Sequence, residues 1–548
     1  MAFSLSSRPS LLSDLLTRQF DMLVIGGGIT GCGIALDAAL RGMKVALVEK
    51  ADFASGTSSR STKLIHGGLR YLKQFELKLV HDVGSERAVV YRNARHVVIP
   101  EKMLLPIIKN GSLGRGSTSM ALRVYDFLAG VKKEELRKML SREETLREEP
   151  LLNTDKVIAG GLYYEYRTDD SRLVIELAKS AVSNGAICLN YVAVTGPLYD
   201  EQKLICGAKV TDQLTGQSFD IKATKVVNAA GPFVDLVRKS DESLYGKRLQ
   251  LTKGVHIVFP YEKLPLHHAA YFDVKDGRMI FAIPRNGVTY VGTTDTVYNQ
   301  NIDSPHPTKD DVQYLIDAVN AMFPTVNLKI ADVVSSWAGL RPLIYEDGKS
   351  PSELSRKDEI IISPSGLISI AGGKLTGYRL MAEKIAELVS KELLAKVRFK
   401  KTSTKEYQLS GGEFASDEDL KAFAKRITTD PYYTWLPVDI RERWVYRYGR
   451  NTEAILRNAE ELKATYADPE QLALAAEITY SYYNEMVTSE LDFVIRRTGM
   501  IYFDKARLDK QLEFISSYFS HVLSRTPEQK EKAWKEFSTA VAEVTEFK

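Results

Sequence analysis

The sequence predicts an α/β protein in which a doubly wound dinucleotide-binding domain holds an inserted antiparallel-sheet domain and precedes a C-terminal helical domain. Three observations support this class. A strand, a glycine-rich turn and a helix come early in the chain, strand-like runs fill its middle, and helical patterns dominate after residue 413. The 548 residues, 44% hydrophobic and 26% charged, suffice for two or three domains that each bury a core.

The first twenty residues carry one apolar face at helical spacing, formed by Leu11, Leu12, Leu15, Leu16 and Phe20. Two interpretations are open: a helix packed on its own domain, or a helix lying on a membrane surface. The sequence has no run of 18 apolar residues and no signal-peptide pattern, so we expect no spanning helix and no secretion signal.

A strand–helix–strand unit follows the leader. Residues 22–25 are continuously apolar, a helix is predicted over 29–41, and residues 45–48 form a second apolar strand that ends at Glu49. Buried parallel strands carry such continuous apolar runs because helices cover both faces of the sheet.

Gly26, Gly28 and Gly31 form a G-x-G-x-x-G turn between this strand and helix. Glycine lets the backbone approach a pyrophosphate, and a helix N-terminus supplies free N–H groups and partial positive charge. Glu49, at the end of the next strand, is placed to accept hydrogen bonds from ribose hydroxyls. In this context the turn predicts dinucleotide binding rather than a plain structural turn.

The segments after residue 100 alternate between helical and strand-like patterns. We predict an exposed helix over 131–148, a helix over 172–185, a strand over 186–194, a strand over 225–230, an antiparallel sheet over 248–300 around Asn286-Gly287, and a strand and helix over 367–394. The resulting division is a leader helix (1–20), nucleotide-binding segments (21–100, 166–235 and 363–395), substrate-domain segments (101–165 and 236–362), a linker (396–412) and a helical domain (413–548).

Composition excludes several classes of function. Cys32, Cys188 and Cys206 form no CxxC pair, which argues against thiolate zinc and iron–sulfur sites and favours buried packing roles. No metal site is predicted. A net charge of +4 is small for this length and argues against nucleic-acid binding.

FAD explains the sequence better than NAD. FAD is long and must be held at both ends, so glycine-rich turns should recur far along the chain. NAAGP ends the strand over 225–230, and GGKLTG follows the strand over 367–371. A helix that begins near Thr376 would direct its N-terminus at the flavin, where reduction adds negative charge.

These motifs, taken together, resemble a known family. IGGGITGCGIALDAALRGMKVALVEK, TSSRSTKLIHGGLRYL, NAAGPFVD, TKGVHIVFP, VGTTDT, AGLRPL and GGKLTGYR are similar to successive blocks of the FAD-dependent (aerobic) glycerol-3-phosphate dehydrogenase family, in the same order. The resemblance covers residues 20–395, and EMVTSELDFVIRRTGM extends it into the helical tail.

The resemblance implies a set of cofactor contacts spread over the chain. They are Gly26, Gly28, Gly31, Glu49, Thr57, Ser58, Ser59, Lys63, Leu64, His66, Gly67, Val192, Ala230, Gly231, Gly373, Lys374, Leu375 and Thr376. It also implies that Arg70 and Arg356, assisted by Tyr71, bind the substrate phosphate, which guanidinium groups suit through charge-assisted forks. The alternative for each arginine is an ordinary surface or salt-bridging residue.

The resemblance implies a catalytic centre as well. His256 matches a position expected to face the substrate hydroxyl and to take its proton, with His66 as a rival. Arg341 and Lys374 match positions near the flavin or the substrate, where their charge would steady developing negative charge. The alternatives are a core histidine for His256 and a solvated side chain for Lys374.

We therefore expect oxidation of sn-glycerol 3-phosphate to dihydroxyacetone phosphate, with electrons passed to a membrane quinone. Such a protein would be cytoplasmic and held peripherally at the inner face of the membrane, with a homodimer as one candidate assembly. The alternatives are an oxidase that uses oxygen, a flavoenzyme for amines or other hydroxy acids, and a flavin-binding scaffold without activity.

Overall fold

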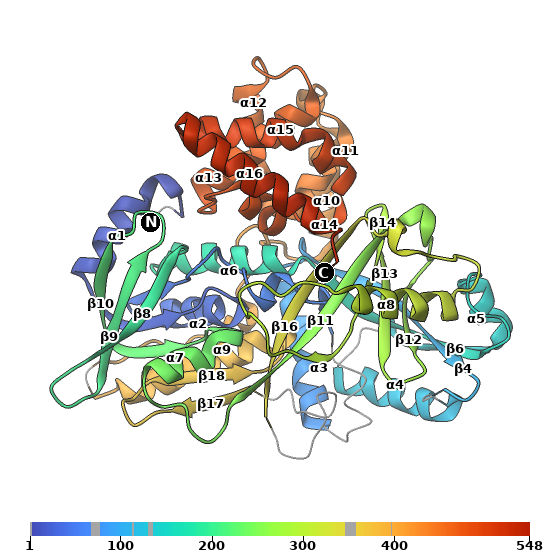
Figure 1. Cartoon of the computed structure of the whole chain (residues 1–548), viewed down its shortest axis with the longest axis horizontal. Coiled ribbons are helices and arrows are strands. Elements are labelled where there is room, and N and C mark those ends of the chain that lie inside the picture. Colours follow the sequence, from blue (N-terminus) through green and yellow to red (C-terminus); the bar gives the residue numbers. More distant parts are fainter. Residues whose placement is uncertain are drawn as a thin grey trace.

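The computed structural model describes residues 3–66, 77–111, 114–129, 135–345, 358–395 and 397–547. Figure 1 shows two sheets side by side, with the C-terminal helices, coloured orange to red, above them. Each sheet takes strands from distant parts of the sequence, so the chain crosses between the two sheets repeatedly.

The first sheet is mainly parallel and contains the apolar runs near the start of the chain. Its described strands are β1 (Gln19–Ile25), β2 (Val45–Val48), β7 (Ile187–Leu189), β8 (Val192–Tyr199), β9 (Ile205–Asp212), β10 (Ser218–Asn228), β17 (Asp358–Ile362) and β18 (Ile368–Gly372). The order is β17-β18-β10-β1-β2-β7, with β9 paired to β10 and β8 to β9. β1 therefore lies inside the sheet, where its continuous apolar sequence is buried.

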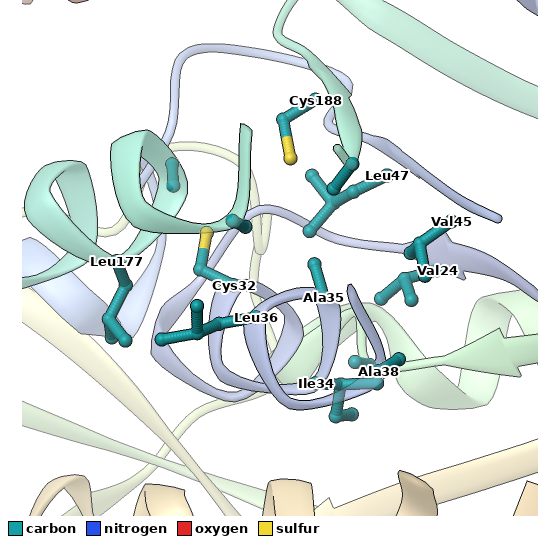
Figure 2. Close-up of a cluster of buried hydrophobic side chains, with 14 of the residues drawn as sticks. Val24, Cys32, Ile34, Ala35, Leu36, Ala38, Val45, Leu47, Leu177 and Cys188 are labelled. Atoms are coloured by element: carbon teal, nitrogen blue, oxygen red, sulfur yellow. The ribbon is translucent and has the colours of Figure 1, made fainter. Parts of the chain in front are cut away.

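Helix α2 (Ile29–Leu40) packs against the first sheet and against α6 (Asp170–Ser183) and α9 (Tyr378–Glu392). Figure 2 shows the packing: Leu177 of α6 lies beside Leu36 of α2, and small alanines face the strands. Close approach depends on small residues, since a Cβ at Gly33 would lie 2.9 Å from the Tyr378 ring. Cys32 and Cys188 are buried in this core, as predicted, whereas Cys206 on β9 is only partly buried, so the prediction of a buried packing role is wrong for Cys206.

The leader forms α1 (Arg8–Thr17), and its apolar face packs on its own domain. Leu11 and Leu15 are 5% and 0% exposed, whereas Leu16 faces solvent. The Arg8 guanidinium forms a buried ion pair with Asp212 at 2.5 Å. The first of the two interpretations of the leader is therefore confirmed.

The second sheet is largely antiparallel. Its described strands are β3 (Leu64–Ile65), β4 (Val98–Ile108), β5 (Lys138–Leu140), β6 (Val157–Thr168), β11 (Leu249–Pro260), β12 (Ala269–Asp273), β13 (Met279–Arg285), β14 (Val288–Gly292), β15 (Thr296–Val297) and β16 (Ser335–Ile344). Asn286 and Gly287, with φ of 49° and 83°, turn β13 into β14, which confirms the predicted hairpin. β11 pairs with both β14 and β16.

The helix predicted over 131–148 is confirmed over residues 142–148 and wrong over residues 138–141. Lys138–Leu140 forms β5, which pairs with β6 and buries Leu140. Ser141 then caps α5 (Arg142–Glu148), because its hydroxyl accepts from the Glu144 N–H at 3.1 Å and its own N–H donates to the Glu144 carboxylate. Pairing of β5 with β6, which buries Leu140, and this capping box make the helix begin at Arg142, later than the mixed-charge pattern predicts.

The strand predicted over 186–194 is two strands. Between β7 and β8, Tyr191 has φ of 55°, which breaks the extended run. The buried Asn190 amide donates to Asp52 at 2.9 Å and to the Met486 carbonyl, so long-range hydrogen bonds hold the break. The other described helices of these two domains are α3 (Leu77–Asn93), α4 (Arg115–Ala129), α7 (Val234–Ser240) and α8 (Lys309–Met322).

The C-terminal part is helical, as predicted. Its helices are α10 (Asp417–Thr429), α11 (Val438–Tyr448), α12 (Thr452–Leu462), α13 (Pro469–Asn484), α14 (Met500–Phe503), α15 (Lys505–Val522) and α16 (Pro527–Glu543). It docks through aromatic rings, since Tyr502 lies 5.1 Å from Trp337 of β16, and through a buried ion-pair network around Asp52. Among the described residues, no helix combines the length and apolarity needed to cross a bilayer.

Candidate active site

A cavity with an empty volume of about 1460 Å³, its open mouth included, lies where the two sheets meet. Its walls are the loops after β1, β2, β10 and β18 together with residues of β11 and β16. Ligands of open α/β sheets bind at the carboxyl ends of the strands. Because its lining extends from the loops of the first sheet to strands of the second, the cavity suits an extended ligand.

The glycine turn forms one end of the cavity. Gly26 has φ of 110°, and a Cβ there would lie 2.7 Å from the Ala229 carbonyl oxygen. A Cβ at Gly31 would lie 1.9 Å from the Gly26 oxygen, so this glycine lets α2 pack close to β1. α2 begins at Ile29, whose N–H donates to the Ser58 hydroxyl at 3.0 Å. The partial positive charge of this helix end suits a pyrophosphate.

Glu49 lies beside this turn, at the end of β2. One carboxylate oxygen accepts from the Gly27 N–H at 2.7 Å, and the other accepts from the Ala51 N–H at 3.0 Å. Burial raises the pKa of Glu49, while these two backbone donors lower it. The carboxylate is thus held at the cavity wall, where ribose hydroxyls could donate to it.

Two further turns line the cavity from distant parts of the chain. Ala230 and Gly231 follow β10, and Gly231 has φ of 54°. Gly373, with φ of 79°, follows β18, and a Cβ there would lie 2.4 Å from the Met381 sulfur. Thr376 joins this turn to His66, because its hydroxyl and the His66 backbone exchange two hydrogen bonds of 3.1 Å.

His256, on β11, faces the cavity from the second sheet. Its ring stacks on Trp337 at 4.8 Å, and its Nε2 lies 3.0 Å from the Thr62 hydroxyl. A Cβ at Gly292 would lie 2.1 Å from the ring, so glycine on the neighbouring strand makes room for it. Burial holds the pKa of His256 well below 6.5, and the positive charges of Arg341 and Lys63 lower it further.

Arg341, on β16, and Lys374, before the short helical turn that leads into α9, supply positive charge to the same cavity. The Arg341 guanidinium donates to the Thr293 hydroxyl at 2.8 Å and to Asp295 at 3.1 Å. It lies over Gly254, where a Cβ would be 2.4 Å from Nη2. The hydrogen bonds fix the guanidinium at the wall next to His256.

The structure brings most predicted site residues together. Those that line the cavity are Gly26, Gly28, Glu49, Thr57, Ser58, Leu64, His66, Ala230, Gly231, His256, Arg341, Gly373, Lys374, Leu375 and Thr376. Four others do not line it: Gly31, Ser59, Lys63 and Val192. The Lys63 amine forms a buried ion pair with Asp170 at 2.6 Å, so it supports the loop rather than facing the cavity. Gly67, Arg70, Tyr71 and Arg356 lie outside the described residues.

Five polar residues of the wall were not predicted from the sequence: Thr30, Ser55, Arg60, Ser61 and Thr62. Arg60 and Thr62 lie in the Ser/Thr-rich segment that the sequence marks as unusual. Their local sequence does not distinguish them from neighbouring polar residues. Thr62, for example, contacts His256, which lies 194 positions away in the chain.

The cavity fits FAD on its own geometry. The glycine turn and the N-terminus of α2 suit a pyrophosphate, Glu49 suits a ribose, and the turn at Gly373 lies at a further part of the wall. Side chains are absent where the backbone must come close, as at Gly28, where a Cβ would lie 3.2 Å from the Ser58 hydroxyl. The N–H donors at the start of α2, the Glu49 acceptor and the distant turn at Gly373 thus agree with a dinucleotide held at both ends.

Family models match two parts of the chain. Residues 21–388 match the family described as FAD dependent oxidoreductase. Residues 402–530 match the C-terminal domain of alpha-glycerophosphate oxidase. The first match alone covers more than half of the chain.

Relatives match the chain over nearly its whole length. It is 49% identical to the aerobic glycerol-3-phosphate dehydrogenase of Staphylococcus haemolyticus, over 100% of this chain and 98% of the relative. It is 50% identical to that of Bacillus subtilis, over 94% of each. The solved glycerol-3-phosphate dehydrogenase of Bacillus halodurans, complexed with FAD, superposes with a TM-score of 0.85 at 42% identity over 99% of both chains.

Proposed function

Since the chain belongs to the aerobic glycerol-3-phosphate dehydrogenase family of FAD-dependent oxidoreductases, we propose that its cavity oxidises sn-glycerol 3-phosphate to dihydroxyacetone phosphate. The chain is an FAD enzyme. When bound, FAD supplies a flavin ring whose N5 accepts the hydride that leaves the substrate carbon. The observation that carries the proposal is that His256, Arg341 and Lys374 line the same cavity as the glycine turn.

His256 takes the proton of the substrate hydroxyl as the hydride leaves carbon. Its Nδ1 is buried without a hydrogen-bond partner, whereas Nε2 lies 3.0 Å from the hydroxyl of Thr62, which also lines the cavity, so we assign Nε2 as the proton acceptor. Its lowered pKa keeps the ring neutral and ready to accept a proton at physiological pH. A bound phosphate dianion nearby would raise that pKa, which strengthens the base once substrate is present.

Arg341 and Lys374 stabilise negative charge. As the hydroxyl loses its proton, negative charge develops on the substrate oxygen, and fixed cations stabilise it without rearrangement. Arg341 is preorganised for this role because Thr293 and Asp295 hold its guanidinium. The substrate phosphate is assigned to Arg70 and Arg356, with Tyr71 assisting, on the resemblance of their sequence blocks.

The electrons go to a membrane quinone, and the protein is peripheral. A quinone dissolved in a bilayer must be met at the membrane surface, so an exposed apolar area near the cavity supports this part of the proposal. Helix α7 follows Phe233, which lines the cavity, and Leu236, Leu244 and Tyr245 are 55%, 40% and 60% exposed. We assign membrane contact to this surface of α7 and the loop after it.

Sedimentation with lipid vesicles tests the membrane contact. Vesicles of phosphatidylglycerol and phosphatidylcholine should sediment the native protein, and the double variant Leu236→Ser, Tyr245→Ser should stay in the supernatant. The variant Tyr432→Ser, which changes a side chain 60% exposed in the C-terminal domain, is the matched control and should behave as the native protein. Equal sedimentation of all three proteins would remove this assignment.

Oxygen is the second candidate acceptor. The observation that favours it is the match of residues 402–530 to the C-terminal domain of alpha-glycerophosphate oxidase. A comparison of peroxide yield with quinone reduction, at equal turnover, separates the two. Quinone reduction without peroxide supports the dehydrogenase, and one peroxide for each substrate oxidised supports the oxidase.

The reaction itself is tested by product formation from a panel of substrates. We expect dihydroxyacetone phosphate from sn-glycerol 3-phosphate and no product from glycerol or from amino acids. His256→Asn should lower kcat by about 10²–10⁴ with FAD content unchanged. His268→Asn is the control, since His268 lies outside the cavity and pairs with Glu148. Full activity of His256→Asn would exclude the proposed base.

A further inference from the structure

Arg60 holds a fixed place at the cavity wall. It directly follows the helical turn Thr57–Ser59, and its N–H donates to the Thr57 carbonyl at 3.1 Å. Gly339 of β16 packs on its backbone, since a Cβ there would lie 2.3 Å from the Arg60 carbonyl oxygen. The backbone of Arg60 is thus held from both sides, and the residue lines the cavity.

The charge of Arg60 is not compensated. Burial lowers the pKa of its guanidinium and Arg496 lowers it further, while only the phenols of Tyr502 and Tyr298 act in the opposite direction. Among the described residues, no carboxylate forms an ion pair with Arg60. The neighbouring cations differ, since Arg341 pairs with Asp295 and Arg496 with Asp52.

A partly buried cation without an anion is unfavourable, because the hydration that it loses is not replaced. Proteins retain such a group where a ligand supplies the missing charge. A guanidinium presents a planar fork of donors that matches two oxygens of a phosphate. The cavity that Arg60 lines is also the one in which phosphorylated ligands are proposed to bind.

Arg60 lies in a short segment that connects the two proposed phosphate sites. Two residues before it, the Ser58 hydroxyl accepts from the Ile29 N–H at the start of α2, where a pyrophosphate would lie. Two residues after it, Thr62 contacts His256, where the substrate would lie. The FAD pyrophosphate and the substrate phosphate are therefore both candidates for binding by Arg60.

We infer that Arg60 is a phosphate-binding residue whose guanidinium neutralises a phosphate group brought into the cavity, in the first place the FAD pyrophosphate. The inference rests on the proposed function, which supplies both phosphorylated ligands. The pyrophosphate is favoured because Arg60 and Ser58 belong to the same short turn, which Leu340 holds by accepting from the Thr57 hydroxyl at 2.6 Å. The substrate phosphate is the other source of the same chemistry.

FAD binding to the apoprotein tests the first source. FAD and riboflavin, which lacks phosphate, are titrated into native protein, Arg60→Gln and Arg60→Lys. Loss of a charge-assisted contact should raise the Kd for FAD by about 10- to 150-fold in Arg60→Gln and leave the Kd for riboflavin unchanged. Arg60→Lys, which keeps the charge but not the fork, should fall between.

Thermal unfolding of the apoprotein gives a second test. Here Arg60→Gln is expected to be neutral or stabilising, whereas it is expected to weaken FAD binding. Because Arg60 is an uncompensated cation, Arg60→Gln should leave the Tm of the apoprotein equal or higher, and should reduce the rise in Tm that FAD produces. Arg41→Gln is the control, since Arg41 is a buried cation that does have an anion, Asp37 at 2.6 Å. That variant should lower the Tm of the apoprotein and leave FAD affinity within about threefold.

Binding of sn-glycerol 3-phosphate to the FAD-loaded protein tests the substrate phosphate as the partner of Arg60. A raised Kd for FAD supports the pyrophosphate as the partner, and an unchanged Kd for FAD with a raised Kd for sn-glycerol 3-phosphate supports the substrate phosphate. Unchanged affinity for both ligands, or equal weakening of FAD and riboflavin, overturns the inference. If Arg60→Gln does not fold, Arg60→Lys decides by the same criteria. Failure of the native protein to bind FAD would instead overturn the proposed function.

Discussion

Replacement of Asp52 by Asn tests how the C-terminal domain supports the cofactor site. Asp52 is fully buried in the loop between Glu49 and the cavity-lining turn at Thr57. Its carboxylate accepts from Arg497 at 2.7 and 3.0 Å and from Arg496 at 2.6 Å, both from the C-terminal domain. The substitution keeps the shape of the side chain and removes the charge that joins the two domains.

The magnitude follows from the pKa and the burial. The two guanidinium groups lower the pKa of Asp52 from 3.8 to about 2, against the opposing effect of burial. That difference is worth about 2 kcal/mol of preference for the charged form. Breaking a buried ion pair on one side costs about 3–5 kcal/mol, because the remaining cations stay buried. We expect Asp52→Asn to destabilise the protein by about 3 kcal/mol and to weaken FAD binding, since the loop that carries Thr57 loses its anchor.

Chemical denaturation of apoprotein and FAD-loaded protein, with FAD titration, measures both effects. A double-mutant cycle with Arg497→Gln isolates the pairwise energy, which should be about 2 kcal/mol or more. Asp509→Asn is the control, because Asp509 is 51% exposed in its ion pair with Lys505 and should change stability by less than about 1 kcal/mol. An Asp52→Asn protein with native stability and native FAD affinity would refute the anchoring role.

The other predictions concern pH and the glycine turn. Because the pKa of His256 lies well below 6.5, kcat/KM measured from pH 8 down to 6.5 should show no decline from protonation of this base, and a decline centred at 6.5 would contradict the site. Burial lowers the pKa of His96 from 6.5 to about 4, so the unfolded chain takes up this proton first. Stability should therefore fall by up to about 3 kcal/mol as pH drops from 6.5 to 4, and His96→Gln should lose this part of the slope in denaturation curves. Gly31→Ala places a Cβ 1.9 Å from the Gly26 oxygen, so the purified variant should contain little FAD, and native FAD content would contradict the packing argument.

Features that depend on interactions between residues close in the chain could be predicted from the sequence. The turn at Gly26 and Gly28 needs a strand before it and a helix after it. A continuous apolar run predicts the strand, and a helical pattern predicts the helix. Asn286-Gly287 specified its hairpin in the same way, since both residues adopt positive φ. His256 was different, because a lone histidine in a strand has no local mark, and only the resemblance indicated it.

Features set by contacts between distant segments were not predictable from the sequence. Lys63 stands among cavity residues in the chain, yet its amine turns to Asp170, 107 positions away. The break between β7 and β8 depends on hydrogen bonds from Asn190 to Asp52 and Met486. Arg60 looks like any polar loop residue until the structure shows no carboxylate paired with it among the described residues. Periodicity carries no information about such partners.

Anaerobic mixing of the FAD-loaded protein with sn-glycerol 3-phosphate tests the central claim most directly, because it follows hydride transfer without any external acceptor. The flavin absorbance should be bleached in a single turnover by this substrate and not by glycerol, and His256→Asn should bleach about 10²–10⁴ times more slowly. A flavin that stays oxidised in the native protein, or that His256→Asn reduces at the native rate, would contradict the account.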